Sequence, residues 1–214
     1  MAEVIRLAPG ESLSPADARR VARAVDRGGI AAFPTDTVYG LGASALCPEA
    51  VERIYRIKGR SAGKALPLLA ASMEQMSPWV EWTPQAEALA KRFWPGGLTL
   101  VLRASTRGRD LSGAKDGTLA VRVPAHPAAR AVLEAAESPW AATSANISGD
   151  EALSDGSEVV RLFAPVVDFV IDAGRGDGRE SSVVDASAGT VRVLREGCIT
   201  AAEIVSASGE TARA

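Results

Sequence analysis

Short apolar runs alternate with segments that carry helix-start signals along most of this chain. Ser14-Pro15-Ala16-Asp17 predicts a helix start, because Ser is a favoured N-cap and Pro is favoured at the first helical position. Gly28-Gly29 predicts the end of that helix. Ile30–Phe33, which ends at Pro34, then predicts a short buried strand. This alternation favours an α/β or α+β domain around one sheet, although periodicity does not give the strand order.

The same patterns predict the other elements. Helices are expected at Pro48–Ile57, Thr83–Phe93, Pro127–Ala136, Ser157–Phe163 and after Thr200. Strands are expected at Leu66–Ala70, Leu98–Arg103, Leu119–Val123, Trp140–Thr143, Val166–Ile171, Ser182–Asp185 and Thr190–Leu194. Loops are expected at Thr35–Gly42, Lys58–Lys64 and Ser144–Gly149, which are rich in glycine, hydroxyls or cations.

Composition excludes several classes of protein. With 214 residues, 47% of them hydrophobic and 23% charged, the chain is of ordinary globular composition and is long enough for one domain or two small ones. No apolar run approaches the ~20 residues that span a bilayer. The N-terminus mixes acid and base without an apolar segment, so it is no secretory signal. We therefore expect a cytoplasmic protein with no membrane association.

The few cysteine and histidine residues also limit the kinds of site that the chain can form. Cys47 and Cys198 lie far apart and form no Cys-x-x-Cys motif, which argues against a zinc site or a disulfide framework. His126 is the single histidine, so mechanisms that need two histidines are excluded. It precedes Pro127 and is interpreted as a helix N-terminal residue without a catalytic role.

Three cations occur together in Lys58-Gly59-Arg60-Ser61-Ala62-Gly63-Lys64, although the net charge of the chain is −2. Cations this close repel one another unless an anion lies between them, so a polyanion such as a nucleoside triphosphate is a natural partner. The segment does not match the phosphate-binding pattern Gly-x-x-x-x-Gly-Lys-Ser/Thr. A solvated basic turn is the alternative interpretation.

Two hydroxyl-rich segments directly follow predicted strands. Thr35–Gly42 offers hydroxyls and a carboxylate for a small polar ligand, and Thr143–Gly149 offers hydroxyls and an amide for a phosphate or a purine. Arg122 lies in the strand Leu119–Val123, where its planar fork could hold a carboxylate or phosphate. Each feature also has an ordinary explanation, namely a capped turn or a solvent-facing strand residue.

Six motifs occur in one order between about Ser14 and Thr200, and together they resemble the YrdC/Sua5 family, the L-threonylcarbamoyladenylate synthases. Each motif is weak alone, but the ordered set is hard to obtain by chance. The motifs are Phe33-Pro34-Thr35-Asp36-Thr37-Val38-Tyr39-Gly40-Leu41-Gly42, Lys58-Gly59-Arg60 with Lys64, Phe93-Trp94-Pro95-Gly96-Gly97-Leu98-Thr99, Ala120-Val121-Arg122-Val123-Pro124 with His126-Pro127, Thr143-Ser144-Ala145-Asn146-Ile147-Ser148-Gly149, and Ser182-Val183-Val184-Asp185 with Leu194-Arg195-Glu196-Gly197.

The resemblance implies a curved mixed β-sheet flanked by helices, with a basic concave cleft. It implies that L-threonine, bicarbonate (or CO2) and ATP are joined into threonylcarbamoyl-AMP with release of pyrophosphate. This is the first step in forming N6-threonylcarbamoyladenosine (t6A) at position 37 of tRNAs that read codons beginning with A. The product would pass to a separate tRNA threonylcarbamoyl-transferase complex.

The resemblance also implies roles for individual residues. Catalytic roles, in neutralising the carbamate and phosphates, fall to Lys58, Arg60 and Lys64. Threonine is expected to contact Thr35, Tyr39, Arg122 and Ser182, with Arg122 on its carboxylate. ATP is expected to contact Lys58, Thr118, Ser144, Asn146 and Arg195. ATP implies Mg2+ held mainly by phosphate oxygens, and no carboxylate cage for a metal is visible in the sequence.

The chain resembles the single-domain form of the family. Residues 1–206 are expected to form the catalytic domain and residues 207–214 a frayed tail, with no second C-terminal domain.

Two alternative functions remain open at this stage. Related domains that make carbamoyl-adenylates from carbamoyl phosphate belong to longer chains, with acylphosphatase, zinc-finger or transferase regions that this sequence lacks. A non-catalytic module could instead bind tRNA or double-stranded RNA in a basic cleft by shape and phosphate contacts. The net charge of −2 and the lack of interleaved basic and aromatic residues disfavour RNA binding as the sole role.

Overall fold

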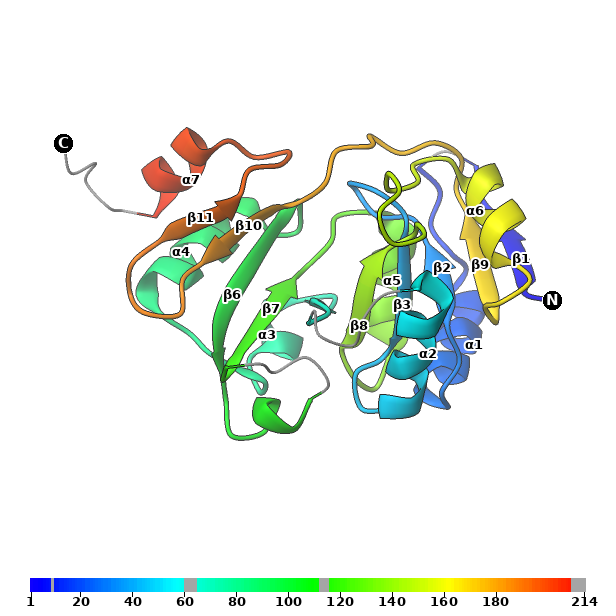
Figure 1. The fold of residues 1–214 in the computed structure, drawn as a ribbon, viewed down its shortest axis with the longest axis horizontal. Coiled ribbons are helices and arrows are strands. Elements are labelled where there is room, and N and C mark those ends of the chain that lie inside the picture. The colour runs from blue at the N-terminus through cyan, green and yellow to red at the C-terminus, as the bar shows by residue number, and fades with distance from the viewer. Residues whose placement is uncertain (9, 60–64, 112–115, 209–214) are drawn as a thin grey trace.

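The computed structural model describes residues 1–8, 10–59, 65–111 and 116–208. The described residues form one eleven-stranded mixed sheet flanked by helices, as predicted (Figure 1). The strands are β1 Glu3–Arg6, β2 Ala31–Phe33, β3 Gly40–Ser44, β4 Leu68–Leu69, β5 Val80–Glu81, β6 Leu98–Ala104, β7 Thr118–Arg122, β8 Trp140–Ser144, β9 Phe169–Asp172, β10 Ser182–Asp185 and β11 Arg192–Arg195. The helices are α1 Pro15–Asp26, α2 Pro48–Lys58, α3 Met73–Met76, α4 Pro84–Phe93, α5 Pro127–Ala135, α6 Gly156–Phe163 and α7 Ala201–Ala207, with a short 3-10 helix at Gly108–Asp110.

The strand order is β1-β9-β2-β3-β8-β4-β7-β6-β10-β11, with β5 paired to β6 outside this path. The pairs β1/β9, β2/β9, β4/β7 and β6/β10 are parallel, and the remaining pairs are antiparallel. The two-residue strand β4 pairs with β8 on one side and β7 on the other, so it joins a group of strands around β3 and β8 to a second group around β6 and β7. Figure 1 shows the two groups side by side. Segments distant in the sequence meet across this junction.

The predicted helix starts are confirmed. The Ser14 side chain accepts a hydrogen bond from the Asp17 N–H, and Pro15 occupies the first helical position. The Thr83 hydroxyl caps α4 in the same way, by accepting from the Ala86 N–H. Proline at this position costs no hydrogen bond, because the first N–H groups of a helix have no intrahelical partner. His126 is indeed the N-cap of α5 and accepts from the Ala128 N–H through Nδ1.

The prediction of a loop through Gly42 is wrong, because Gly40–Ser44 forms strand β3 between β2 and β8. Glycine weakens strand propensity but permits close packing. A Cβ atom at Gly42 would lie 2.8 Å from the Phe33 ring and 2.9 Å from the Trp140 ring. These two rings pack edge to face with centroids 5.4 Å apart. The aromatic pair therefore fills the space that a side chain would need.

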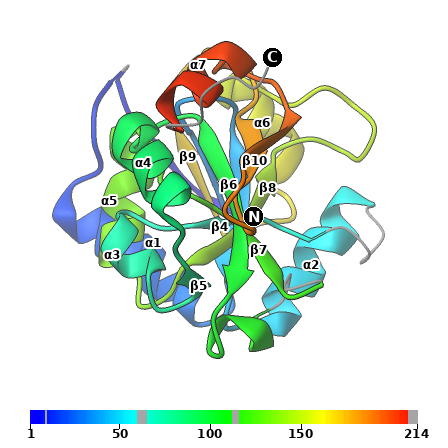
Figure 2. The ribbon, with the colours of Figure 1, turned by 90° about the vertical axis from the view of Figure 1, so that its left-hand side faces the viewer.

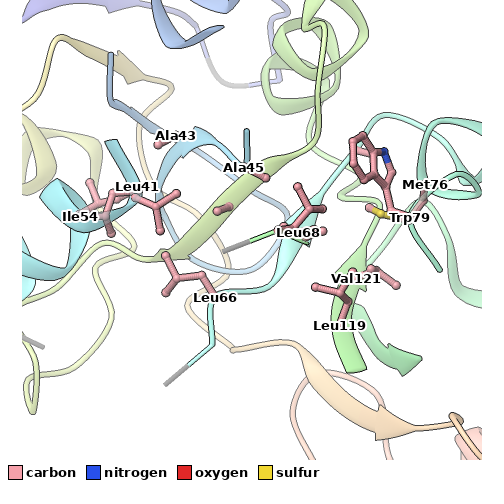
Figure 3. Close-up of a cluster of buried hydrophobic side chains, with 14 of the residues drawn as sticks. Leu41, Ala43, Ala45, Ile54, Leu66, Leu68, Met76, Trp79, Leu119 and Val121 are labelled. Carbon is pink, nitrogen blue, oxygen red and sulfur yellow. The ribbon is translucent and has the colours of Figure 1, made fainter. Parts of the chain in front are cut away.

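The core forms two clusters along the sheet. Helices α1 and α5 bury apolar residues against β2, β8 and β9, and a larger cluster extends from α2 and α6 to α4. Figure 3 shows part of the larger cluster, with Ile54 and Leu41 at one end and Trp79 and Met76 at the other. Helices α1, α3, α4 and α5 lie on one side of the sheet and α2 lies on the other (Figure 2). Within the described ranges, no helix has the length and apolarity to cross a membrane.

Candidate functional site

A cavity of about 430 Å³ lies where the two groups of strands meet, a volume typical of small-molecule sites. Its lining comes from the segment before β3, from the ends of α2 and β8, and from β6, β7, β10 and β11. The polar residues of the lining are Thr35, Thr37, Tyr39, Lys58, Thr99, Arg122, Thr143, Ser144, Asn146, Ser148, Glu180, Ser181 and Arg195. The Lys58 region, Arg122 and the Ser144 turn thus share one hollow.

Lys58 does not lie in a loop, as the sequence had predicted. It is the last residue of α2 and only 2% exposed. Its ammonium group donates to the Ser144 carbonyl and, at 2.6 Å, to Asn146 Oδ1. Gly59 follows in a left-handed conformation with φ 61°, which ends the helix at this point. The end of α2 is therefore tied to the segment after β8, and a charge is placed at the cavity wall.

Arg122 ends β7 and is buried, with its guanidinium bonded to three neighbours. Nη2 donates to Asp36 Oδ1, Nη1 to Thr37 Oγ1 and Nε to the Gly96 carbonyl, each at 2.9 Å. Burial lowers the pKa of Arg122, and the Asp36 charge opposes that change. The strand residue thus faces the cavity, which excludes the solvent-facing interpretation.

Arg195 ends β11 and also lines the cavity. It donates to the Ser181 carbonyl at 2.8 Å through Nη2 and to Glu180 Oε2 at 2.6 Å through Nη1. Ser181 and Thr99 hydroxyls are 3.0 Å apart, which places a buried hydroxyl pair beside this guanidinium. Glu180 supplies the one carboxylate among the described lining residues, against the cations Lys58, Arg122 and Arg195.

The segment before β3 contributes hydroxyls. Thr35 Oγ1 donates to the Val38 carbonyl at 2.6 Å and lies 2.9 Å from Thr37 Oγ1. Ser144 Oγ, at the end of the neighbouring strand β8, donates to Asn146 Oδ1 at 2.7 Å. Strand register brings these two segments together, because Gly40 at the start of β3 is paired with Ser144 at the end of β8.

Tyr39 lines the cavity, but its hydroxyl is used elsewhere. It donates to the Gly174 carbonyl at 2.8 Å and accepts from the Ala173 N–H at 3.0 Å. Burial raises the pKa of Tyr39 to about 12. The hydroxyl thus anchors the backbone that follows β9, which indicates a structural use for it.

Replacing Tyr39 with Phe tests this use of the hydroxyl. The substitution removes a donor and an acceptor for buried backbone groups, so we expect the free energy of unfolding to fall by about 1–3 kcal/mol. Urea unfolding at neutral pH measures this loss. An unchanged free energy of unfolding would contradict the anchoring role.

Two predicted site residues do not line the cavity. Ser182 is fully buried, and its hydroxyl donates to the Ile199 carbonyl at 2.6 Å and accepts from the Gly197 and Ile199 N–H groups. Its neighbours Ser181 and Val183 line the cavity instead, because successive residues of a strand point to opposite faces. Thr118 lies at the other end of β7 from Arg122, paired with Arg103.

The remaining predicted residues divide into two groups. The cavity brings together Thr35, Tyr39, Lys58, Arg122, Ser144, Asn146 and Arg195. Arg60 and Lys64 lie outside the described residues.

Sequence reasoning missed Thr37, Thr99 and Ser181 as lining residues. Thr37 and Thr99 belong to motifs identified in the sequence, and their hydroxyl groups could have marked them as candidate ligand-binding residues. Ser181 could have been distinguished from Ser182 only if the face of β10 had been known.

No group of three or more His, Cys, Asp or Glu side chains within the described ranges is arranged to hold a metal ion. The cavity therefore offers cations and hydroxyls more than metal ligands. Such a site suits anionic groups that must be held close together.

Comparison with known proteins gives consistent matches. The Sua5/YciO/YrdC family model, whose description reads "Telomere recombination", matches residues 23–197. Threonylcarbamoyl-AMP synthase of Pyrococcus abyssi is 43% identical over 189 residues, which are 87% of this chain and 55% of that protein. The enzyme of the same name from Halorhodospira halophila is 38% identical over 172 residues, which are 78% of this chain and 87% of that protein.

Solved structures agree. Pyrococcus abyssi Sua5 complexed with L-threonine superposes with a TM-score of 0.89 at 40% identity, over 98% of this chain and 62% of that one. Escherichia coli YciO gives a TM-score of 0.86 at 29% identity, over 95% of this chain and 100% of that one. The chain spans about half the length of its curated relatives from Pyrococcus abyssi and Bacillus subtilis.

Proposed function

Because the chain belongs to the Sua5/YciO/YrdC family, we propose that it is an L-threonylcarbamoyladenylate synthase. It joins L-threonine, bicarbonate or CO2, and ATP into threonylcarbamoyl-AMP and pyrophosphate. The observation that carries this proposal is the single cavity in which Lys58, Arg122 and Arg195 converge with hydroxyls from both groups of strands.

The chemistry requires two anions to meet. The threonine amine forms a bond to the carbon of CO2 and loses a proton, which gives an N-carboxylate; when bicarbonate is the donor, its C–OH bond breaks and the hydroxide leaves with the amine proton as water. A carboxylate oxygen then attacks the α-phosphorus of ATP, and the bond to the β-phosphate oxygen breaks as pyrophosphate departs. Positioning and charge neutralisation supply most of the rate in such a reaction. No protein nucleophile is needed.

The cavity supports an assignment of roles. Lys58 neutralises the carbamate and phosphate oxygens from the end of α2, together with Arg60 and Lys64. Arg122 binds the threonine carboxylate, with Thr35 and Tyr39 beside the amino acid. Ser144 and Asn146 bind the nucleotide, and Arg195 reaches its triphosphate.

Mg2+ is expected to accompany ATP and to be held chiefly by phosphate oxygens. The described lining supports this arrangement, since its one carboxylate, Glu180, is already paired with Arg195. The product would pass to a separate tRNA-modifying complex that uses it to form t6A at position 37.

The direct test is release of pyrophosphate from ATP by the purified protein. We expect release that requires both L-threonine and bicarbonate, with threonylcarbamoyl-AMP identified by its mass. Release that requires carbamoyl phosphate instead would assign the domain to the other carbamoyl-adenylate chemistry. Absence of release, together with salt-sensitive binding of RNA, would contradict an enzymatic function.

A further inference from the structure

Asp36 lies in the segment before β3 and is not among the residues that line the cavity. Its Oδ1 accepts two hydrogen bonds, one from Arg122 Nη2 at 2.9 Å and one from the Ala125 N–H at 2.8 Å. The carboxylate therefore joins three segments of chain: its own, the end of β7, and the turn that leads into α5.

The Asp36–Arg122 pair differs from the other ion pair at the cavity. The Arg122 and Asp36 side chains are 8% and 20% exposed, whereas those of Arg195 and Glu180 are 46% and 45% exposed. Exposed pairs contribute little and rearrange readily. A buried arginine whose partner is removed keeps an uncompensated charge in a site of low dielectric.

The contacts of Arg122 also fix the direction of its fork. Hydrogen bonds to Asp36, Thr37 and Gly96 use three of the five N–H groups that a guanidinium carries. Two N–H groups remain beyond these three hydrogen bonds to described residues, and a carboxylate binds two N–H groups in a bidentate pair. Rotation of the guanidinium would break the bond to Asp36, which is the charged member of the three acceptors.

We propose that Asp36 is a positioning residue, which acts through Arg122 to present a preoriented fork to the carboxylate of the amino acid substrate. This inference rests on the proposed function, in which Arg122 binds threonine. Asp36 touches no substrate in this scheme. Its effect is therefore confined to the carboxylate end of threonine and does not extend to ATP.

The test compares Asp36→Ala with Asp36→Asn in the purified full chain. Asparagine keeps an oxygen that can accept from Arg122 and Ala125, whereas alanine removes it. We expect Asp36→Ala to raise the KM for threonine by about tenfold or more, with the KM for ATP changed by less than about twofold. Asp36→Asn should give a smaller rise and remain folded, so the inference stays testable if the alanine variant unfolds.

Two further comparisons distinguish a positioning role of Asp36 from a general loss of folded structure. Glu134→Ala removes the exposed acidic partner of Arg130 on α5 and should change neither KM. In an Arg122→Ala background, Asp36→Ala should cause no additional rise in the threonine KM, because its effect passes through the arginine. A structural role would instead lower activity in both backgrounds.

The outcomes also distinguish this inference from the proposed function. If the wild-type protein makes no threonylcarbamoyl-AMP, both the proposed function and the positioning role of Asp36 are overturned. If the wild-type protein makes it, but both Asp36 variants affect threonine and ATP equally or leave the threonine KM unchanged, the positioning role alone is overturned.

Discussion

Replacing Lys58 with Met is expected to lower the rate of threonylcarbamoyl-AMP formation by about a thousandfold or more, since a fixed cation that faces developing charge in a cavity contributes several kcal/mol. Methionine keeps most of the aliphatic length that fills the space at the end of α2. Pyrophosphate release per folded molecule, at saturating threonine and ATP, measures the effect.

Because Lys58 is buried, its replacement is expected to lower the stability of the protein as well as its activity. Its ammonium group bonds the Ser144 carbonyl and Asn146, so the substitution leaves two acceptors without this donor. We expect an accompanying loss of about 1–3 kcal/mol in the free energy of unfolding, which thermal or urea unfolding would record. Lys91→Met is the matched control, because Lys91 is exposed on α4 and pairs with Glu87. A folded Lys58→Met protein with normal turnover would remove Lys58 from the mechanism.

The second large effect is expected at Arg122. Replacing it with Ala should raise the KM for threonine by about a hundredfold, equivalent to about 2.7 kcal/mol, because charge-assisted bidentate bonds are lost. The KM for ATP should change much less. Steady-state kinetics with each substrate varied in turn measure the two values.

Arg122→Lys should be nearly as harmful as Arg122→Ala. A lysine ammonium cannot reproduce the planar fork that contacts Asp36, Thr37 and Gly96 while it faces the cavity. Arg130→Lys provides the control, since Arg130 forms an exposed pair within α5. Equal losses for threonine and ATP would instead indicate that Arg122 binds phosphate.

The local elements could be predicted from short stretches of sequence. Helix starts at Pro15, Pro48, Pro84 and Pro127 are confirmed, because the proline, and at three of the four helices a capping side chain, act within one turn of the helix. The exceptions arise where distant residues determine the local structure. β3 forms despite Gly40 and Gly42 because it pairs with β2 and β8, and because the Phe33 ring occupies the space beside both glycines and the Trp140 ring the space beside Gly42.

The candidate residues, and the kind of chemistry they suit, could also be inferred from residue types in motif order. Their surroundings could not be inferred. Lys58 was expected in a loop but is buried at a helix end, where Asn146 and the Ser144 carbonyl accept hydrogen bonds from its ammonium group. Ser182 was expected at the cavity but faces away from it, because the direction of alternation in β10 depends on its pairing with β6.

The surroundings of the site residues, which residue patterns did not predict, are determined by contacts between distant parts of the chain. Asp36 and Arg122 are 86 positions apart, and Lys58 and Asn146 are 88 positions apart. Residue types and their spacing define which helices and strands form, and which charges and hydroxyls are available. Strand order and register define which of those groups meet at one cavity, since both depend on pairing between segments that carry no sequence signal for each other.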